Sequence, residues 1–396
     1  MEALVVSRPP GNSPLIMLAA GGTGGHVFPA EALAAQLAQR GCRLVLVTDR
    51  RGDELSGRLG ELETFKVRAG GIAGKGFAAR IFSVIEILLG TWQAWWLINR
   101  MKPTVVVGFG GYASVPTMLA ASYAKTKAAI HEQNAVLGRA NCLLAGRVQK
   151  IATSFAKVAA IPESAAKNVI QTGMPVRPAV AAIGGQAYPA LTADSEIQIL
   201  VLGGSQGASV FSRVMSEALA LVSESLKKRI KITQQCRLED EEGVRQAYRQ
   251  LGVKAELSHF FKDVHERIAG AHLLICRSGA STIAEITTIG RPAILVPYPH
   301  AVDDHQTNNA HSVDEAGGGW LLSETAFTPE SLAQRLNDLF AIPRTLENAA
   351  AAAKRAGNPD AAERLADMGF SLMPSNGDTD GNFGAGSKSD DQREAA

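Results

Sequence analysis

The chain has 396 residues, of which 46% are hydrophobic and 6% are aromatic, and its formal net charge is +2 at pH 7. This length suits two domains of ordinary size, and a charge so near zero gives no general affinity for nucleic acid. The four cysteines are scattered without a C-x-x-C spacing. That pattern argues against a zinc site and a disulfide framework, and it fits a reducing cytoplasm.

The N-terminal residues 1–13 show no basic stretch followed by an apolar one, so we do not interpret them as a secretory signal. A strand is predicted at 15–19, and the glycine-rich loop AAGGTGGHVFP follows at 19–29. Glycines between a strand and a helix let a ligand approach the backbone, and the first N–H groups of the helix point at an anion. We therefore predict a phosphate site here, followed by a helix at 30–40, with His26 available for proton transfer.

This loop matches neither a Walker A motif nor the G-x-G-x-x-G dinucleotide fingerprint. A tight turn without a ligand is therefore the alternative. The next predicted strand covers 43–48, and its apolar pattern continues the alternation of strands and helices.

The segment 81–98, IFSVIEILLGTWQAWWLI, contains one charge, Glu86. It is at the short limit for a membrane span, it contains Gln93, and it lies inside the strand–helix alternation. Its apolar surface exceeds what one buried helix face needs, and aromatic residues favour the membrane interface. The tryptophans are Trp92, Trp95 and Trp96, and the flanking basic residues are Lys75, Arg80, Arg100 and Lys102. We predict a helix on an anionic membrane surface; a fully buried helix is the alternative.

Glycines follow the next predicted strand, 105–109, in the sequence GFGGYASVP. In one register they read Gly108-x-Gly110-x-x-Ala113, with Glu132 nineteen residues further on. This register is the best case for a dinucleotide site, and it would make the protein an NAD-dependent oxidoreductase. A tight strand–helix turn explains the same glycines.

Four polar residues, HEQN at 131–134, follow the strand predicted at 128–132. In open parallel sheets, ligands bind beyond the carboxyl ends of the strands, so the run indicates a functional site. Capping of the next helix is the alternative for Asn134. One further strand is predicted at 150–152, and the proline-containing stretch 173–196 breaks the periodicity.

The second half repeats the pattern of the first. Strands are predicted at 197–202, 231–235, 273–276 and 293–297, and the loop GGSQGA at 203–208 precedes a helix at 210–226. Two strand–loop–helix openings of this kind indicate two α/β domains with parallel sheets.

A last motif, CRSGASTIAE at 276–285, offers backbone and hydroxyl donors at a helix start. Glu285 is placed to accept hydrogen bonds from a vicinal diol such as a ribose. A favourable interaction with the helix dipole is the alternative, worth under about 1 kcal/mol.

In this order, the motifs GGTGGH, GGYAS, HEQN, GGSQGA and RSGA-x-T-x-x-E closely resemble the MurG family, within glycosyltransferase family 28. The resemblance runs from about residue 15 to about residue 373. It implies an α/β GT-B fold, in which two Rossmann-like domains with parallel sheets face a central cleft. It also implies an inverting transferase that moves N-acetylglucosamine (GlcNAc) from UDP-GlcNAc to the C4 hydroxyl of undecaprenyl-diphospho-N-acetylmuramoyl pentapeptide in peptidoglycan synthesis.

The domain organisation implied by the resemblance has six parts. They are a flexible N-terminus (1–13), an acceptor and membrane domain (14–178), a linker (179–196), a UDP-GlcNAc domain (197–345), a C-terminal helix packing back on the first domain (346–373) and a disordered tail (374–396).

The resemblance also implies site residues. The catalytic base is His26 or Glu132, with His26 preferred. The predicted UDP-GlcNAc residues are Thr23, Gly24, Gly25, Asn134, Arg177, Ser205, Phe261, Ala280, Ser281, Thr282, Ile283, Ala284, Glu285 and Gln306. The predicted acceptor residues are Gly110, Gly111, Tyr112 and His131.

No D-x-D motif lies within the predicted domains, so we expect neither a metal nor another cofactor. Anionic membrane lipids are expected partners, and other cell-wall synthesis proteins stay open. The expected location is peripheral, on the cytoplasmic face of the inner membrane. A non-enzymatic membrane scaffold is the remaining alternative.

Overall fold

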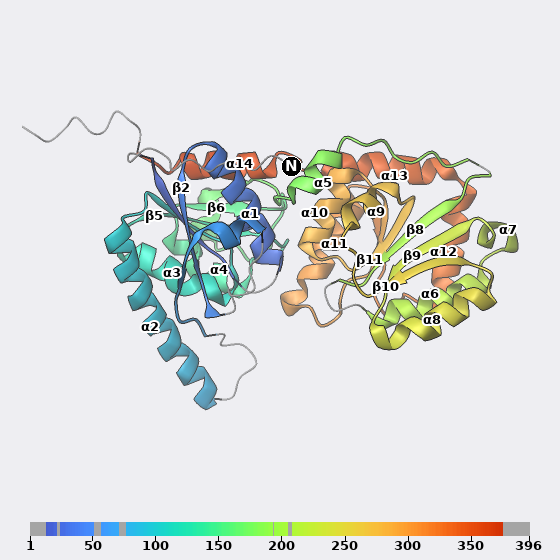
Figure 1. Cartoon of the computed structure of the whole chain (residues 1–396), viewed down its shortest axis with the longest axis horizontal. Coiled ribbons are helices and arrows are strands. Elements are labelled where there is room, and N and C mark those ends of the chain that lie inside the picture. The colour runs from blue at the N-terminus through green and yellow to red at the C-terminus, as the bar shows by residue number, and fades with distance from the viewer. Residues whose placement is uncertain are drawn as a thin grey trace, which may run out of the picture.

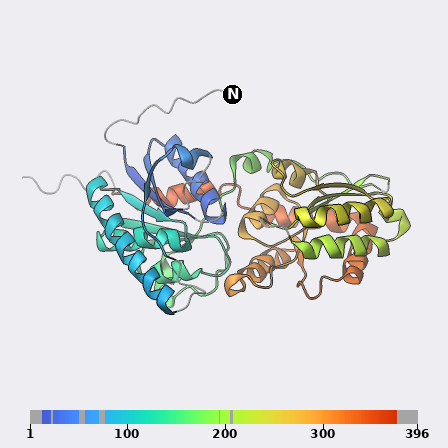
Figure 2. The same cartoon turned by 60° about the horizontal axis from the view of Figure 1, so that its bottom comes forward.

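A computed structural model describes residues 13–21, 24–50, 57–70, 77–192, 194–204 and 208–374; side chains at 57, 58 and 77–80 are not described. The two predicted terminal segments lie outside these residues, apart from residues 13 and 374. Figure 1 and Figure 2 show two α/β domains side by side. We call them the N-terminal domain, which contains the first sheet, and the C-terminal domain, which contains the second.

The first sheet is parallel throughout its described strands, in the order β3-β2-β1-β4-β5-β6-β7. The strands are β1 (Leu15–Ala19), β2 (Arg43–Thr48), β3 (Glu63–Lys66), β4 (Val105–Gly108), β5 (Lys127–Glu132), β6 (Lys150–Thr153) and β7 (Val169–Gln171). The central strands β1 and β4 are wholly buried, because helices cover both faces of a parallel sheet.

The helices of this domain lie on its two faces. They are α1 (Gly24–Gln39), α2 (Phe77–Met101), α3 (Gly111–Tyr123) and α4 (Arg139–Leu144), with short 3-10 turns η2 (Gly57–Glu61), η3 (Ala145–Arg147) and η4 (Glu163–Asn168). On one face, Leu33 and Leu37 of α1 pack into a buried cluster. On the other face, Leu97 of α2 and Met118 of α3 pack into a second cluster.

The second sheet is also parallel, in the order β10-β9-β8-β11-β12-β13. Its strands are β8 (Ile197–Leu202), β9 (Ile230–Gln235), β10 (Lys254–Ser258), β11 (Leu273–Cys276), β12 (Ala293–Leu295) and β13 (Gly319–Leu321). The remaining helices are α5 (Pro178–Ile183), α6 (Ser209–Leu221), α7 (Glu224–Lys227), α8 (Leu238–Gln250), α9 (Val264–Gly270), α10 (Ala280–Ile289), η5 (Val302–Asp304), α11 (His305–Glu315), α12 (Pro329–Ala341), α13 (Pro343–Ala356) and α14 (Ala361–Phe370).

Both sheets share one winding. In each, the first strand lies at the centre, the next two extend the sheet to one side, and the fourth pairs on the other side of the first. This is the Rossmann-type order, and ligands bind where the direction of winding reverses. The reversal falls between β1 and β4 and between β8 and β11, where three of the predicted glycine loops follow β1, β4 and β8. The predicted fold class is therefore confirmed.

Two predicted helices and the predicted linker differ from the structure. The first begins at Gly24 and not at residue 30, so Gly24, Gly25 and His26 form the first turn of α1. The helix predicted at 210–226 is interrupted, because Val222 and Ser223 adopt extended backbone between α6 and α7. The predicted linker 179–196 begins with most of helix α5, which packs against α10.

The C-terminal segment 346–373, predicted as one helix, contains parts of two. Helix α13 ends before Gly357, whose backbone is extended, and Pro359 disfavours helical backbone at the residue before it. Only α14 packs on the N-terminal domain, against α1, where Leu365 joins the cluster of Leu33 and Leu37. In Figure 1 this red helix lies across the blue half of the molecule.

The chain therefore passes between the domains twice, once between β7 and α5 and once between α13 and α14. The two crossings touch. A Cβ atom built on Gly173, at the first crossing, would lie 2.5 Å from the Cβ of Asn358, at the second. Gly173 has a positive φ of +84°, so glycine suits this position for both space and backbone conformation.

Candidate active site

A cavity of about 220 Å³ lies at the carboxyl end of the first sheet, where the two domains meet. His26, Tyr112 and Glu132 line it from the N-terminal domain, while Asp303 and His305 line it from the C-terminal domain. Gly110, Gly111 and Asn134 complete the predicted residues on its wall. The structure thus brings six predicted residues from the ends of three different strands, β1, β4 and β5, together in one cavity.

His26 enters this cavity from the first turn of α1. Its Nδ1 lies 3.1 Å from Oε1 of Gln133. The other edge of the ring faces Gly111, where an added Cβ would lie 3.4 Å from Nε2. Gly111 also has a positive φ of +68°, so a glycine at this position leaves space beside the ring and avoids backbone strain.

Glu132, the second candidate base, is only 2% exposed. Its Oε1 accepts from the backbone N–H of Asn134 at 3.0 Å, and its Oε2 accepts from the N–H of Gly138 and from Nδ2 of Asn141, both at 2.8 Å. Both carboxylate oxygens therefore hold the loop after β5 in place.

His131 does not line the cavity, although it was predicted to contact the acceptor. Side chains alternate along a strand, and between its neighbours on β5 this ring is turned into the core, where it is 0% exposed. Its Nε2 lies 3.2 Å from the carbonyl oxygen of Gly173. Burial lowers the pKa of His131 to about 4. A direct contact between this ring and an acceptor is therefore excluded in this structure.

The glycine register after β4 has a packing explanation. A Cβ on Gly108 would lie 2.7 Å from Sδ of Met118, so α3 packs tightly on β4 at this point. Gly110 starts α3 with a positive φ of +78°. Glu132, the acidic residue of the dinucleotide alternative, already accepts hydrogen bonds from the three donors named above. The geometry thus explains these glycines without a dinucleotide.

In the C-terminal domain, the six predicted UDP-GlcNAc residues at 280–285 lie on α10. Glu285 falls in its second turn, is 8% exposed, and accepts from Nε and Nη2 of Arg177 at 3.1 and 2.8 Å. Burial raises the pKa of Glu285, and Arg177 opposes that rise. The Arg177 guanidinium also lies over the ring of Phe28, 5.4 Å from its centroid. Arg177 thus joins α10 to the start of α1.

Asn309, which sequence reasoning missed, connects the two domains. It is 0% exposed. Its Oδ1 accepts from the N–H of Ala135 at 2.8 Å, and its Nδ2 donates to Oδ1 of Asn134 and to the carbonyl of Ser278, both at 3.1 Å. Its position three residues after Gln306 on α11 would have indicated a shared helix face.

The remaining predicted residues are distributed as follows. Oε1 of Gln306 accepts from the N–H of Tyr298 at 2.9 Å. The Phe261 side chain is buried beneath Arg267, whose guanidinium lies 4.2 Å from the ring centroid. Ser281 and Thr282 are partly exposed on the first turn of α10. Thr23 and Ser205 lie outside the described residues.

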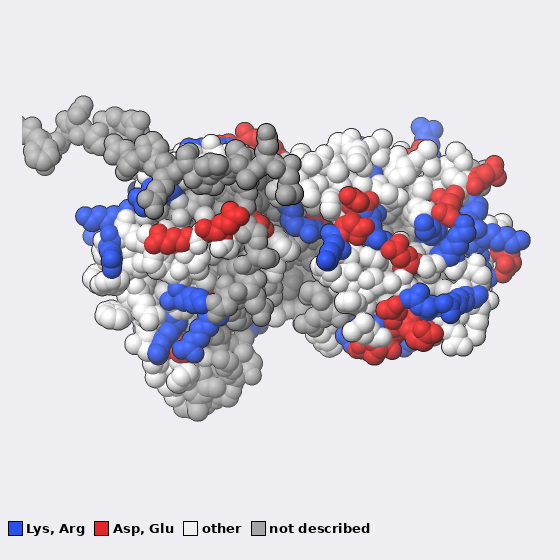
Figure 3. Space-filling model, viewed as in Figure 1, with Lys and Arg blue, Asp and Glu red and all other residues white. Residues whose placement is uncertain are grey.

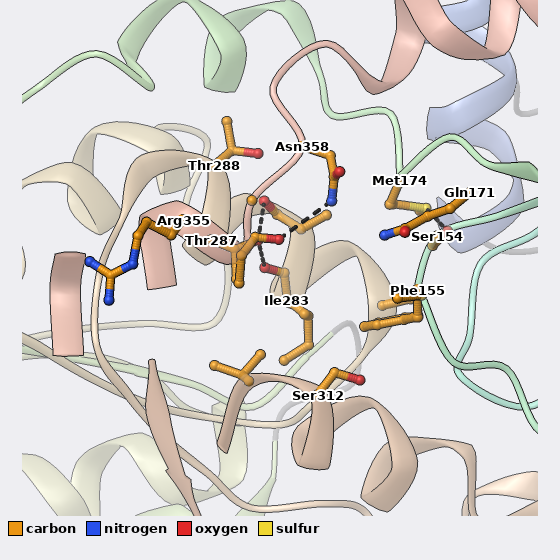
Figure 4. A pocket seen from close by; sticks show the side chains of 16 residues that line it. Ser154, Phe155, Gln171, Met174, Ile283, Thr287, Thr288, Ser312, Arg355 and Asn358 are labelled. Atoms are coloured by element: carbon orange, nitrogen blue, oxygen red, sulfur yellow. Dashed lines mark hydrogen bonds between the residues drawn. The ribbon is translucent and has the colours of Figure 1, made fainter. Parts of the chain in front are cut away.

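A second cavity, of about 320 Å³, lies beside the two crossings (Figure 4). Ala280, Ile283 and Ala284, predicted to bind UDP-GlcNAc, line it. Figure 4 shows Phe155 and Met174 on the opposite side of the cavity from Ile283. The predicted donor residues are therefore divided between two cavities.

No group of three or more His, Cys, Asp and Glu residues that could hold a metal ion occurs in the described part of the chain.

Helix α2 presents a large apolar surface. Ser83, Ala94 and Ile98 are buried on its inner face, whereas Leu88 and Trp92 are 64% and 66% exposed. The other exposed apolar residues of α2 are Ile81, Phe82, Val84, Ile85, Leu89, Trp95 and Trp96. By length and composition the span Ile81–Met101 could cross a membrane. Of its apolar stretch of 18 residues, 33% is buried inside the protein. Figure 3 shows mostly white residues, which are neither basic nor acidic, along the part of the left edge where Figure 1 places the described side chains of α2.

Comparison with known proteins gives consistent results. The models of the glycosyltransferase family 28 N-terminal and C-terminal domains match residues 16–153 and 198–365. A relative from Paramagnetospirillum magneticum, 57% identical over 91% of this chain and 97% of its own, is the UDP-N-acetylglucosamine--N-acetylmuramyl-(pentapeptide) pyrophosphoryl-undecaprenol N-acetylglucosamine transferase. A relative with the same name from Rhodospirillum rubrum is 55% identical over 90% of this chain and 92% of its own. The crystal structure of Acinetobacter baumannii MurG superposes with a TM-score of 0.72 at 28% identity, covering 90% of this chain and 99% of that one.

Proposed function

The chain belongs to glycosyltransferase family 28, and from this premise we propose that it transfers GlcNAc from UDP-GlcNAc to undecaprenyl-diphospho-N-acetylmuramoyl pentapeptide. The observation that carries the proposal is the 57% identity, over nearly the whole of both chains, to a transferase of that name. The cavity between the two domains supplies the place where a nucleotide sugar and a lipid-linked sugar would meet.

The proposed reaction is a displacement at the anomeric carbon of the donor sugar. The C4 hydroxyl oxygen of the acceptor attacks this carbon from the face opposite UDP, so the new bond has the inverted, β configuration. The bond from the anomeric carbon to the diphosphate oxygen breaks, and its electron pair leaves with UDP. The enzyme must therefore accept one proton and stabilise one leaving diphosphate.

We assign the role of general base, which accepts the proton of the acceptor hydroxyl, to His26. A general base needs a lone pair within reach of the hydroxyl; His26 lines the cavity, and its Nε2 lies beside Gly111. Glu132 is less suitable, because both of its oxygens accept hydrogen bonds from the loop it supports. We therefore assign Glu132 to positioning Asn134 and the loop around it.

We assign the binding of the diphosphate and the ribose to the C-terminal domain. The first turn of α10 offers backbone N–H groups from 280 to 282, and a helix N-terminus stabilises an anion. Arg177 adds a fixed positive charge nearby. Glu285 would accept hydrogen bonds from the ribose hydroxyls, and Arg177 already holds its carboxylate in place at 2.8 Å.

The transfer assay tests the proposal directly. Purified protein, labelled UDP-GlcNAc and a short-chain lipid-linked muramoyl pentapeptide should give a labelled disaccharide product, released together with UDP. His26→Ala is the matched inactive control. Absence of transfer with correctly folded, UDP-GlcNAc-binding protein would overturn the assignment.

We further propose that the exposed face of α2 attaches the enzyme peripherally to the cytoplasmic face of the inner membrane, where the lipid-linked acceptor lies. Aromatic and aliphatic side chains on one helix face favour the interface. Glu86 and Gln93 fit a helix lying on the surface better than one crossing the bilayer. On the inner face, Gly90 lets the helix approach the carbonyl oxygen of Arg68, which occupies the place a Cβ would take. Lys75 and the side chain of Arg80 lie outside the described residues.

A flotation experiment with anionic liposomes tests this attachment. Leu88→Ser combined with Trp92→Ser and Trp96→Ser should release the protein, while transfer to a water-soluble acceptor survives. Tyr123→Ser, a substitution of an exposed aromatic residue on α3, is the matched control and should leave liposome binding unchanged. A triple variant that still floats with the liposomes would contradict the role of α2.

A further inference from the structure

Gln133 lies between the two histidines of the N-terminal domain. Its Oε1 is 3.1 Å from Nδ1 of His26, and its Nε2 is 3.1 Å from Nδ1 of His131. The side chain is 3% exposed. A buried amide between two imidazole rings fixes which ring nitrogens carry hydrogen.

The orientation of the amide follows from the backbone around it. Nε2 of Gln133 also lies 2.9 Å from the carbonyl oxygen of Phe109 and 3.1 Å from that of His131. Carbonyl oxygens accept hydrogen bonds and never donate them, so the amide nitrogen must face them and Oε1 must face His26. Because Oε1 also only accepts, Nδ1 of His26 must carry the hydrogen.

The second histidine completes the chain of hydrogen bonds in the same direction. Burial keeps His131 neutral at neutral pH, since it lowers the pKa of the ring to about 4. Nε2–H of this ring donates to the carbonyl of Gly173, which leaves Nδ1 to accept from Gln133. Donation therefore runs from Gln133 to His131, and from His26 to Gln133.

A neutral imidazole with hydrogen on Nδ1 has its lone pair on Nε2. On His26, Nε2 is the nitrogen beside Gly111, in the wall of the cavity between the domains. The opposite tautomer would present an N–H to the acceptor hydroxyl and could not remove its proton.

We propose that Gln133 is a positioning residue that holds neutral His26 in the Nδ1–H tautomer, so that Nε2 is the atom that accepts the proton of the acceptor hydroxyl. This inference rests on the proposed role of His26 as general base. In the step, the hydroxyl O–H bond breaks and Nε2–H forms, while the oxygen bonds to the anomeric carbon and UDP leaves with the electron pair of the broken bond.

The test measures the tautomer itself. Long-range 1H–15N spectra of the full chain labelled at its eight histidines distinguish protonated from unprotonated ring nitrogens, and loss of one set of signals in His26→Ala assigns His26. The wild-type protein should show Nδ1 protonated and Nε2 unprotonated at a pH where the ring is neutral. Gln133→Met should lose this preference and lower kcat about 10²-fold, with KM for UDP-GlcNAc near the wild-type value.

A matched control supports this result. Gln149→Met removes a glutamine whose Oε1 accepts from the backbone N–H of Ala128 at the other end of β5, at 2.7 Å, and should change neither the His26 signals nor kcat.

An unchanged His26 tautomer in Gln133→Met would overturn the inference, and so would a changed tautomer with unchanged kcat. Failure of the proposed function gives a different pattern, in which His26→Ala keeps its activity while the tautomer still depends on Gln133. Binding of UDP-GlcNAc to each variant, measured by calorimetry, confirms that the protein is folded.

Discussion

The two domains present polar side chains to the same junction in different ways. In the N-terminal domain, His26, Gln133 and Glu132 are held by a network of hydrogen bonds that belongs mostly to that domain. In the C-terminal domain, Glu285 is held chiefly by Arg177, and among the described residues no side chain caps the first turn of α10. A proton acceptor must be fixed before the reaction, whereas groups that bind a ligand must exchange their partners. This difference agrees with the proposal that the proton is accepted in the N-terminal domain and that the donor binds to the C-terminal domain.

The largest effect that sharpens this comparison is expected at His26. His26→Ala should lower kcat by about 10²–10⁴-fold because the general base is lost, while UDP-GlcNAc binding measured by calorimetry stays near the wild-type value. His311→Ala, a substitution of an exposed histidine on α11, is the matched control and should leave kcat unchanged. If Glu132→Ala abolishes turnover and His26→Ala does not, the roles of the two residues must be exchanged.

In contrast to His26→Ala, Glu285→Ala should act on the binding of the donor. Loss of charge-assisted hydrogen bonds to the ribose should weaken donor binding by roughly 1.5–3 kcal/mol, with little effect on KM for the acceptor. Glu217→Ala, at an exposed position of α6, controls for the loss of one negative charge. An unchanged KM for UDP-GlcNAc would rule out a ribose contact.

Contacts between the domains should differ in strength according to their burial. Asn309→Ala leaves buried groups without hydrogen bonds, so the free energy of unfolding should fall by about 1–3 kcal/mol. Lys157→Ala removes an exposed ion pair with Glu315, in which the charged atoms are 3.4 Å apart. This substitution should change the free energy of unfolding by less than about 0.5 kcal/mol. Denaturant unfolding measures both variants. Equal losses would show that the exposed pair contributes as much as the buried amide.

The smallest effect concerns the pH dependence of donor binding. Burial raises the pKa of Glu285 above its ordinary 4.5, so the carboxylate gains a proton at a higher pH than an exposed glutamate does. Since the protonated form loses its charge-assisted bonds, the Kd for UDP-GlcNAc should rise as the pH falls toward 4.5 from above. Calorimetry at several pH values should show this trend in the wild-type protein. The same slope in Glu285→Gln would assign it to another group.

Sequence reasoning found the centres of both sheets and missed their edges. The central strands β1 and β8 are apolar apart from Gln198, because both faces of a parallel sheet are covered, and their predicted bounds equal the observed ones. The strands without a prediction are β3, β7, β10 and β13, which are the four sheet edges. Glu63–Lys66, for example, is largely exposed, so it lacks the apolar pattern on which the prediction depends.

The site shows a similar division. Motifs after strands were predicted to converge, and the shared winding of the sheets brings them to one junction. Orientation was not predictable, because adjacent residues of a strand point to opposite faces, and a slip of one residue exchanges the inward and outward side chains. That is why His131 was placed at the acceptor, and why the role of Gln133 appeared only with its neighbours.

The return of the last helix also constrains the order of synthesis. The hydrophobic cluster beneath α1 includes Leu365, Ala366 and Met368, which are made after the whole C-terminal domain. Arg40, directly after α1, pairs with Asp367 at 2.5 Å and lies over the ring of Phe370. Domains made first generally fold first on the ribosome, but here part of the cluster that contains Leu33 and Leu37 is missing until the C-terminal domain has been synthesised. The nascent chain therefore has a long interval in which its first domain offers an apolar surface to chaperones.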